Sequence, residues 1–442
     1  MAIPSQGLEQ HTGHPRSYPL KLHANTSTGN KACHGNFLTK SRCGEMREAI
    51  QQLKKEAIES FRSRFGVPPT KLVMAPGRIN LMGEHLDYND GYVLPATIAK
   101  YTLVAARPTP DKPQNVATFY TKSLNETAQI SLASHSRLRR GGWQSYLTGV
   151  LVGFAKVAGM IPAFYAAIVS NIPLGAGLSS SAALEVATAT LLEALTGFHL
   201  QPQEKAILCQ QAENQFAGVP CGIMDPFTCI HGQANNVIFL DCHSHEYEYI
   251  PLPDVELVLL VINTMVQHEL GNSEYETRRQ ECAAALAKLN QPSWRCVSPG
   301  DLQAHRSRLS EREYHRARHV VSEIERTQNM VAALREGDLE AIAHLMHASH
   351  ASLRDDFQVS CKELDLLVDI TQKLSLPERI FGTRMTGGGF GGCTVSLVHR
   401  SNAKKLMREI SSRYQAQTGI QPNGFITPLT EGACTLPLTF VR

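Results

Sequence analysis

The sequence predicts an α+β protein with two domains. Its 442 residues are enough to build two separate hydrophobic cores. Short runs with β-strand character, such as residues 101–106 and 127–132, occur among longer stretches whose apolar residues recur with helical spacing. Apolar residues make up 43% of the chain and charged residues 19%, which are the proportions of a globular protein.

Charge and cysteine usage limit the classes of partner. The chain has 43 lysines and arginines against 40 aspartates and glutamates, a net charge of +3 that is too balanced to indicate nucleic-acid binding. Its 11 cysteines include no C-x-x-C pair, which fits reduced thiols better than disulfides or a zinc site. We find no apolar run of about 20 residues and no signal peptide. We therefore expect a cytoplasmic protein with no membrane or nucleic-acid partner, and we predict a monomer.

The N-terminal part divides near residue 44. Residues 1–44 are rich in His, Ser, Thr, Gly and Lys and show no sustained periodicity, so we expect a disordered or loosely attached extension. Residues 45–65 instead have the pattern of an amphipathic helix. Its apolar positions are Met46, Ile50, Leu53, Ala57 and Phe61.

A cluster of charged side chains follows a predicted strand in the stretch 71–95. The cluster consists of Arg78, Glu84, His85 and Asp87. These residues lie between glycines, in a segment otherwise lined by Leu, Met and Tyr. Isolated charges in loops are usually only solvated, but polar groups crowded into a closed pocket are costly unless they are paired. The stretch therefore favours a polar ligand with many hydroxyl groups.

A glycine- and serine-rich loop follows the strand pattern of residues 164–169 and precedes a helical run. Pro173, Gly175 and Gly177 allow positive φ and a close approach of the backbone to a ligand. Residues 179–181, all serine, fall where helix N-caps fall, and a helix N-terminus attracts phosphate. An ordinary turn capped by serine is the alternative interpretation. The loop is neither a Walker A loop, which needs Gly-Lys-Ser/Thr, nor a dinucleotide-binding Gly-x-Gly-x-x-Gly.

A single carboxylate, Asp225, lies in an apolar turn bordered by Gly and Pro at residues 218–227. A lone aspartate in a turn is most often a helix cap or an Asx-turn. The helical pattern before it, about 203–217, carries Glu213. Strand patterns follow at 236–241 and 256–263.

Successive amphipathic helices are predicted at 313–372. One of them carries His344, His347 and His350, for which we expect an exposed or core-packed face because no carboxylate motif accompanies them. Residues 384–397 then contain five glycines in six residues before another strand pattern. Flanking apolar strand residues make this loop unlike a linker.

Three segments, in order along the chain, resemble the motifs of the GHMP kinases. The segment Gly-Arg-Ile-Asn-Leu-Met-Gly-Glu-His-Leu-Asp-Tyr-Asn at 77–89 closely resembles the galactokinase signature. The loop at 171–188 looks like the second GHMP motif, which binds ATP, and Met-Thr-Gly-Gly-Gly-Phe-Gly-Gly at 385–392 looks like the third. The resemblance implies a ribosomal-protein-S5-like N-terminal domain at 45–250, a ferredoxin-like C-terminal domain at 251–442, and an active site between them.

The resemblance also implies a reaction and the residues that carry it. The reaction is phosphoryl transfer from ATP to the anomeric hydroxyl of galactose, with Asp225 as base and Arg78 stabilising that carboxylate and the transferring charge. The implied sugar contacts are Glu84, His85, Asp87, Gly222 and Tyr275. The implied nucleotide contacts are Pro173, Gly175, Ala176, Gly177, Leu178, Ser179, Ser180, Ser181 and Trp143, although Trp143 could equally be a core residue. Ser181 and Glu213 match the family's ligands for Mg²⁺, a hard cation that prefers oxygen.

The chain departs from the galactokinase pattern at several positions. Leu86 stands where threonine is usual, and Met82 replaces isoleucine conservatively. Pro226 replaces a glutamine and removes a backbone donor, but we expect activity to survive. Thr264 and Met265 replace Ser-Asn near the sugar side.

Two alternative functions stay open at this point. One is a related kinase for another sugar, such as N-acetylgalactosamine, L-arabinose or galacturonate, because the departures near the sugar side weaken the substrate assignment. The other is a non-catalytic galactose sensor. Such sensors lose residues from the Ser/Ala part of the phosphate loop, whereas Ser180, Ser181 and Ala182 are present here.

Overall fold

The computed structural model of the chain describes residues 44–109, 115–132, 141–267, 271–374 and 380–439. The expected N-terminal extension at 1–44 lies outside the described residues, except for residue 44, which begins the first helix. None of the described helices is both long enough and apolar enough to cross a membrane.

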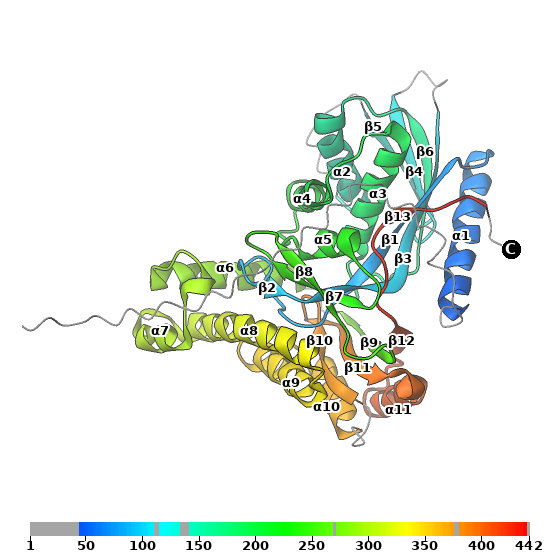
Figure 1. The fold of residues 1–442 in the computed structure, drawn as a ribbon. Coiled ribbons are helices and arrows are strands. Elements are labelled where there is room, and N and C mark those ends of the chain that lie inside the picture. The colour runs from blue at the N-terminus through cyan, green and yellow to red at the C-terminus, as the bar shows by residue number, and fades with distance from the viewer. Residues whose placement is uncertain (1–43, 110–114, 133–140, 268–270, 375–379, 440–442) are drawn as a thin grey trace, which may run out of the picture. The chain divides into compact units, whose positions relative to one another are not determined.

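Helices and strands are mixed along the chain, as the sequence predicts (Figure 1). The helices are α1 (Gly44–Phe65), α2 (Trp143–Ala158), α3 (Ser180–Thr196), α4 (Pro202–Ala212), α5 (Met224–His231), α6 (Gly271–Leu289), α7 (Pro299–Ala304), α8 (Glu311–Glu336), α9 (Leu339–Asp355), α10 (Lys362–Lys373) and α11 (Arg400–Thr418). The strands are β1 (Lys71–Asn80), β2 (Tyr92–Val93), β3 (Pro95–Pro108), β4 (Val116–Thr121), β5 (Glu126–Ser131), β6 (Phe164–Ser170), β7 (Asn236–Asp241), β8 (Tyr247–Pro251), β9 (Leu257–Gln267), β10 (Ile380–Thr386), β11 (Gly391–His399), β12 (Asn423–Thr427) and β13 (Cys434–Thr435). Short turns of other helix types are Glu213–Ala217, a π-helix, and Trp294–Cys296 and Arg306–Arg308, both 3₁₀.

The largest described sheet has the strand order β13-β1-β3-β6-β4-β5, with helices on both faces (Figure 1). Because successive side chains of a strand point to opposite faces, the two faces of β1 bury different residues. Leu72 and Met74 pack with α1, whereas Val73 and Ala75 belong to the core that also holds α2 and α3. Burial on both faces explains the continuous apolar sequence at the start of β1.

The second sheet, β10-β11-β9-β12, is antiparallel throughout. On β9, Val258, Leu260 and Ile262 pack with α10 and α11. Leu259 and Val261 point the other way and join the same core cluster as α2 and α3. The two sheets therefore share one apolar core. A smaller antiparallel sheet has the strand order β2-β7-β8.

Most predicted elements are confirmed, and the differences have physical causes. The helix predicted at about 203–217 is α-helical only as far as Ala212 and continues as the π-helix. The predicted turn around Asp225 is instead the first turn of α5. Strand β13 was not predicted, because only its pairing with β1, far away in sequence, makes it a strand. Cys434, on this strand, is disulfide-bonded, so the expectation of reduced thiols is wrong for this residue.

The histidines of α9 lie on a face that is exposed at one end and packed at the other. His344 is exposed, whereas His350 is buried with its Nε2 3.2 Å from the Asp365 carboxylate. This is the arrangement that the sequence predicts for them.

Met265, near the end of β9, has an unfavourable backbone conformation. Its φ is +59°, and its side chain is 55% exposed, so no burial compensates for the conformation. Residues with a Cβ enter this left-handed region at a cost, and asparagine does so most readily among them. The galactokinase pattern usually has asparagine at this position, so the methionine is a local destabilising departure.

We predict that Met265→Asn raises the free energy of unfolding by about 0.5–1 kcal/mol, because asparagine tolerates positive φ. Chemical denaturation of the purified protein measures this. Met160→Asn is the matched control, since Met160 is 85% exposed without a positive φ. Equal effects of the two substitutions would contradict the explanation.

Candidate active site

The centre of the candidate site is an ion pair between Arg78 on β1 and Asp225 on α5. Arg78 Nε donates to Asp225 Oδ1 at 2.7 Å, and Arg78 Nη2 donates to Asp225 Oδ2 at 2.8 Å. Burial alone would lower the pKa of Arg78, but the charges of Asp225 and Glu84 outweigh this effect and raise it. The structure thus brings together two of the residues that the sequence predicts to act on the same hydroxyl group.

The phosphate loop meets this ion pair directly. Arg78 Nη1 donates to the carbonyl oxygen of Gly177 at 2.7 Å. The hydroxyl of Ser179 donates to Asp225 Oδ2 at 2.5 Å. Ser179 occupies the N-cap position of α3 in a left-handed conformation, but its side chain makes no cap hydrogen bond. The expectation of a serine cap is therefore wrong for this side chain, which is turned toward Asp225 instead.

The remaining residues of the loop form a compact turn before α3. Gly175 and Gly177 have positive φ, at 66° and 73°, as the glycine pattern predicts. Ala176 and Leu178 are buried, while Pro173 is half-buried. Ser180 and Ser181 are the first residues of α3, so the N–H groups of its first turn lie beside the ion pair.

Pro226 is compatible with the helix that carries Asp225. It lies in the first turn of α5, where backbone N–H groups have no partner within the helix. Phe227 N–H, the next along, donates normally to the carbonyl of Ile223 at 3.1 Å. The backbone donor that proline removes is thus one that the helix does not use.

Ser181 and Glu213, the predicted Mg²⁺ ligands, are in contact. Ser181 Oγ donates to Glu213 Oε1 at 3.0 Å, and Cys221 Sγ donates to Glu213 Oε2 at 3.3 Å. Glu213 begins the π-helix, a type of turn that often occurs at functional sites. Burial, followed by the charge of Asp225, raises the pKa of Glu213 to about 7.

These residues fit a divalent cation. Glu185, one helical turn beyond Ser181, is fully buried, and neither of its carboxylate oxygens has a hydrogen-bond partner among the described residues. Burial, followed by repulsion from Glu213, raises its pKa well above the ordinary value. Mg²⁺ is usually held by one or two protein oxygens together with phosphates and waters. A cation here would relieve the repulsion between these carboxylates. Sequence reasoning missed Glu185, which lies in an apolar helical run.

On the sugar side, His85 lies among aromatic rings. Its ring centroid is 5.5 Å from that of Tyr275 and 4.7 Å from that of Phe357, and its Nδ1 is 2.8 Å from the Tyr88 hydroxyl. Burial, reinforced by nearby His319 and Arg278, lowers the pKa of His85 to about 3, so the ring is neutral. The structure therefore brings the predicted sugar residues His85 and Tyr275 together.

Asp87 and Gly222 also lie in contact. A Cβ atom on Gly222 would fall 2.1 Å from Asp87 Oδ2, so only glycine leaves room for this carboxylate. Burial, followed by the charge of Asp225, raises the pKa of Asp87 to about 7. The predicted sugar contact at Gly222 is thus a place where the backbone approaches Asp87 closely.

Glu84 is held by the third glycine motif. Its Oε1 accepts hydrogen bonds from Thr386 Oγ1 at 3.0 Å and Gly387 N–H at 2.7 Å. Its Oε2 accepts one from Asn80 Nδ2 at 2.9 Å. These partners are residues that sequence reasoning missed, although Thr386 lies inside the recognised motif. A sugar contact of Glu84 stays a prediction.

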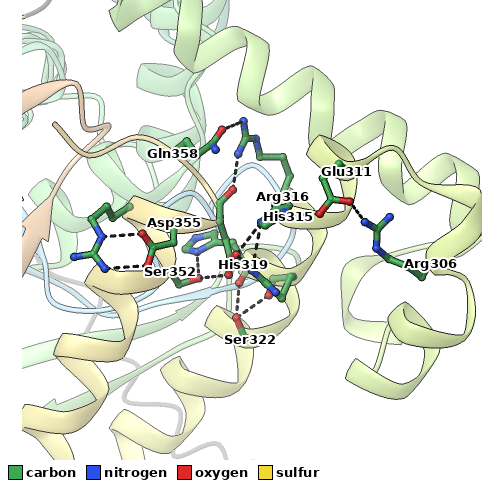
Figure 2. Close-up of polar contacts among 12 residues, drawn as sticks. Arg306, Glu311, His315, Arg316, His319, Ser322, Ser352, Asp355 and Gln358 are labelled. Carbon is green, nitrogen blue, oxygen red and sulfur yellow. Dashed lines mark hydrogen bonds and ion pairs between the residues drawn. The ribbon is translucent and has the colours of Figure 1, made fainter.

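Next to the sugar side, residues of α8, α9 and the segment after α9 form a polar network (Figure 2). Arg316 Nη2 donates to Gln358 Oε1 at 3.0 Å. His319 Nδ1 lies 2.9 Å from Ser352 Oγ, and its Nε2 lies 3.2 Å from the carbonyl oxygen of Glu84. Figure 2 shows these side chains directed toward one another between the helices. Through His319, the network contacts the backbone of the signature segment at Glu84.

Trp143 lies at the start of α2 and is half-buried. The indole Nε1 of Trp143, at the start of α2, donates to Glu126 Oε2 at 2.7 Å, and its half-buried ring packs against the core. Its predicted contact with the nucleotide stays a prediction.

Leu86 is fully buried in a core cluster with Phe227 and Phe357. Its departure from the family pattern is therefore accommodated by apolar packing.

Comparisons with known proteins identify related families and relatives. The galactokinase galactose-binding signature matches residues 59–108, the GHMP kinases N terminal domain matches 145–233, and the GHMP kinases C terminal model matches 330–416. Galactokinase from Homo sapiens is 44% identical over 372 residues, which cover 83% of this chain and 93% of that protein. Galactokinase from Roseiflexus is 40% identical over 382 residues, covering 85% of this chain and 96% of that protein.

Solved structures give the same result at the level of the fold. The crystal structure of Lactococcus lactis galactokinase complexed with galactose aligns with a TM-score of 0.79 at 31% identity, covering 88% of this chain and 100% of that one. A crystal structure of mevalonate kinase aligns with a TM-score of 0.56 at 17% identity and shows a shared fold alone.

The fold and the meeting of the three motifs define a GHMP kinase, which confirms the α+β fold class expected from the sequence. Within that superfamily the identities of 40–44% over most of the chain are decisive. The chain belongs to the galactokinase family. The domain boundaries given above, at residues 44 and 250, stay predictions.

We predict that Asp87 makes stability depend on pH. Its pKa rises from 3.8 to about 7 on folding, so the folded protein binds this proton more tightly than the unfolded chain. The associated stability is fully present below about pH 4 and is lost as the pH rises through about 7. Between pH 4 and 7 the free energy of unfolding should fall less steeply with pH in Asp87→Asn than in the wild type. The difference in slope should be up to about 1.4 kcal/mol per pH unit. Urea denaturation at a series of pH values measures this.

Asp90→Asn is the control for that experiment, because Asp90 is exposed in the same segment. Its free energy of unfolding should depend on pH with the same slope as that of the wild type. An Asp87→Asn slope equal to that of the wild type would show that Asp87 is already ionised in the folded protein.

Proposed function

We propose that this protein catalyses the transfer of a phosphoryl group from ATP to the anomeric hydroxyl of D-galactose, giving α-D-galactose 1-phosphate and ADP. The observation that carries the proposal is the convergence of Arg78, Asp225 and Ser179, from the sugar signature, α5 and the phosphate loop. Membership of the galactokinase family supports the same activity. Phosphoryl transfer asks mainly for positioning and charge stabilisation, which such a site supplies.

Asp225 is the proposed base. A carboxylate has about four lone-pair sites, and the protein occupies both oxygens through Arg78 and a second site on Oδ2 through Ser179. One lone pair of Oδ1 is left for the proton of a sugar hydroxyl. The charge of Arg78 would stabilise the transferring group.

ATP would bind through the loop from Pro173 to Ser181 and the N-terminus of α3. Ser181 and Glu213 would hold Mg²⁺, which neutralises charge on the phosphates when it is bound. Glu185 lies close enough to repel Glu213, so we propose that it adds to the attraction for the cation. Trp143 is the proposed neighbour of the base of the nucleotide.

The sugar would lie against Glu84, His85, Asp87, Gly222 and Tyr275. His85 is neutral and its Nδ1 lies beside the Tyr88 hydroxyl, so its Nε2 is left to donate or accept one hydrogen bond with a sugar hydroxyl, according to the tautomer. Asp87 has a pKa near neutrality and can also serve either as donor or as acceptor. A monomeric state and a cytoplasmic location stay predictions from the sequence.

Replacement of Asp225 tests the base. We expect Asp225→Ala to lower turnover by about 10²–10⁴-fold, because proton acceptance is lost, while nucleotide affinity changes little. A coupled assay of ADP formation with galactose and Mg-ATP measures turnover, and calorimetric titration measures nucleotide binding.

Two further variants complete that test. Asp225→Asn retains an acceptor for Arg78 and serves if the alanine variant does not fold. Asp254→Ala, at an exposed turn, should behave like the wild type. Full activity of a folded Asp225 variant would show that another group is the base, and absence of turnover in the wild type would refute the proposed reaction.

Replacement of Gly222 tests the sugar side. The added Cβ of Gly222→Ala must displace the Asp87 carboxylate, so we expect the KM for galactose to rise about 10–100-fold. The dissociation constant of the nucleotide should stay within about twofold of the wild type. Gly300→Ala is the matched control, since its Cβ would have its nearest neighbour at 3.6 Å. An unchanged KM for galactose would remove Asp87 from the sugar site.

A further inference from the structure

A buried polar link joins the sugar signature to the third glycine motif. We call it the Glu84–Thr386 clasp, and it consists of Asn80, Glu84, Thr386 and Gly387. The side chains of Asn80, Glu84 and Thr386 are each at most 1% exposed. Members of the clasp come from positions about three hundred residues apart in sequence. Water does not compete for these hydrogen bonds, so each group depends on its partners in the clasp.

The hydroxyl of Thr386 is the centre of the clasp. Its Oγ1 accepts from the Asn80 N–H at 3.2 Å and lies 3.1 Å from the Asn80 carbonyl and 3.0 Å from Glu84 Oε1. It therefore touches both the end of β1 and the carboxylate of the signature. Gly387, the next residue, donates its N–H to the same Glu84 oxygen. One side chain thus fixes the third glycine motif to the sugar signature at two points.

The other side of the clasp touches the phosphate loop. A Cβ atom on Gly387 would fall 3.1 Å from Gly177 Cα and 2.9 Å from the Gly177 carbonyl oxygen. That carbonyl oxygen is the one that accepts from Arg78 Nη1. The clasp, the phosphate loop and the central ion pair therefore form a closed ring of contacts, through Gly387, Gly177 and Arg78.

Two buried charged side chains, Arg384 and Glu323, contact the signature segment next to the clasp. Arg384, with no exposed surface, donates from Nη1 to the Leu81 carbonyl at 3.0 Å, and its Nη2 lies 3.4 Å from Glu84 Oε1. Glu323 accepts from the Gly83 N–H at 3.1 Å. Leu81 and Gly83, which come just before Glu84, are held in this way, so we expect a shift of Glu84 to be passed on to Thr386 and Gly387.

We propose that Thr386 is a positioning residue that couples galactose binding to nucleotide binding through Glu84. The proposal rests on the function proposed above. A sugar held by the signature fixes Glu84, Glu84 fixes Gly387, and Gly387 fixes the phosphate loop against which it packs. Occupation of one site therefore favours the conformation that binds the other ligand, and this coupling is reciprocal.

The test measures galactose binding by calorimetric titration, without nucleotide and with a saturating non-hydrolysable ATP analogue and Mg²⁺. The ratio of the two dissociation constants is the coupling. In the wild type we expect galactose to bind at least about fivefold more tightly with the analogue. In Thr386→Val the ratio should fall to near one and kcat should fall with it, while the dissociation constant without nucleotide stays within about twofold.

Two variants separate coupling from general stability. Thr386→Ser keeps the hydroxyl and should restore the ratio. Thr383→Val, on the same strand, removes an equally buried hydroxyl bonded to Ser396 Oγ at 2.9 Å and should keep the ratio of the wild type. If Thr386→Val does not yield folded protein, Thr386→Ala replaces it.

Several outcomes would overturn the proposal. They are a ratio of one in the wild type, a wild-type ratio in folded Thr386→Val, or an equal loss in Thr383→Val. Each of these can occur in a protein that phosphorylates galactose, and then the clasp alone is refuted. A wild-type protein that neither binds nor phosphorylates galactose would instead refute the proposed function.

Discussion

The ion pair between Arg78 and Asp225 is the interaction on which the rest of the structure depends. Removing two charges from water is costly, and the attraction between them compensates only when geometry and further hydrogen bonds are complete. Here both oxygens of Asp225 are engaged by Arg78, Ser179 adds a further donor, and Gly177 accepts the remaining guanidinium contact. The chain must therefore place β1, α5 and the phosphate loop together with little tolerance, and the shared core of the two sheets supplies the rigidity.

Close backbone approach is the second constraint, and it explains where glycine is required. Gly387 packs on Gly177 at distances that leave no space for a side chain, and Gly222 leaves room for the Asp87 carboxylate. These contacts let two loops and a carboxylate share a small volume around the ion pair. Burial, followed by the charge of Asp225, raises the pKa values of Asp87 and Glu213 there to about 7. A site built in this way is suited to ligands that bring hydroxyls, a cation and phosphates.

The sequence predicted much of the fold and of the site, because the signals concerned are local. Helical spacing identified α1, and the glycine pattern identified the phosphate loop. Contacts between distant segments were not predictable in this way: Thr386 with Glu84, and β13 with β1, have no local signature. Ser179 fits an N-cap pattern in the sequence, but its hydroxyl donates to Asp225 instead of capping α3. Likewise Glu213 lies in a helical pattern in the sequence, and only the structure shows that a π-helix begins at this residue.

The pairing of β13 with β1 has a consequence for how the protein is made. Met74 and Val73, on the strand that carries Arg78, pair with Cys434 and Thr435, and the Leu436 N–H donates to the Leu72 carbonyl at 2.8 Å. During translation this edge of the first sheet must wait for residues 434–436, about 360 residues later in the chain, to emerge from the ribosome. Until then its backbone groups are open to other strands, and unpaired edges invite aggregation. Chaperone protection of the nascent chain would matter most in that interval.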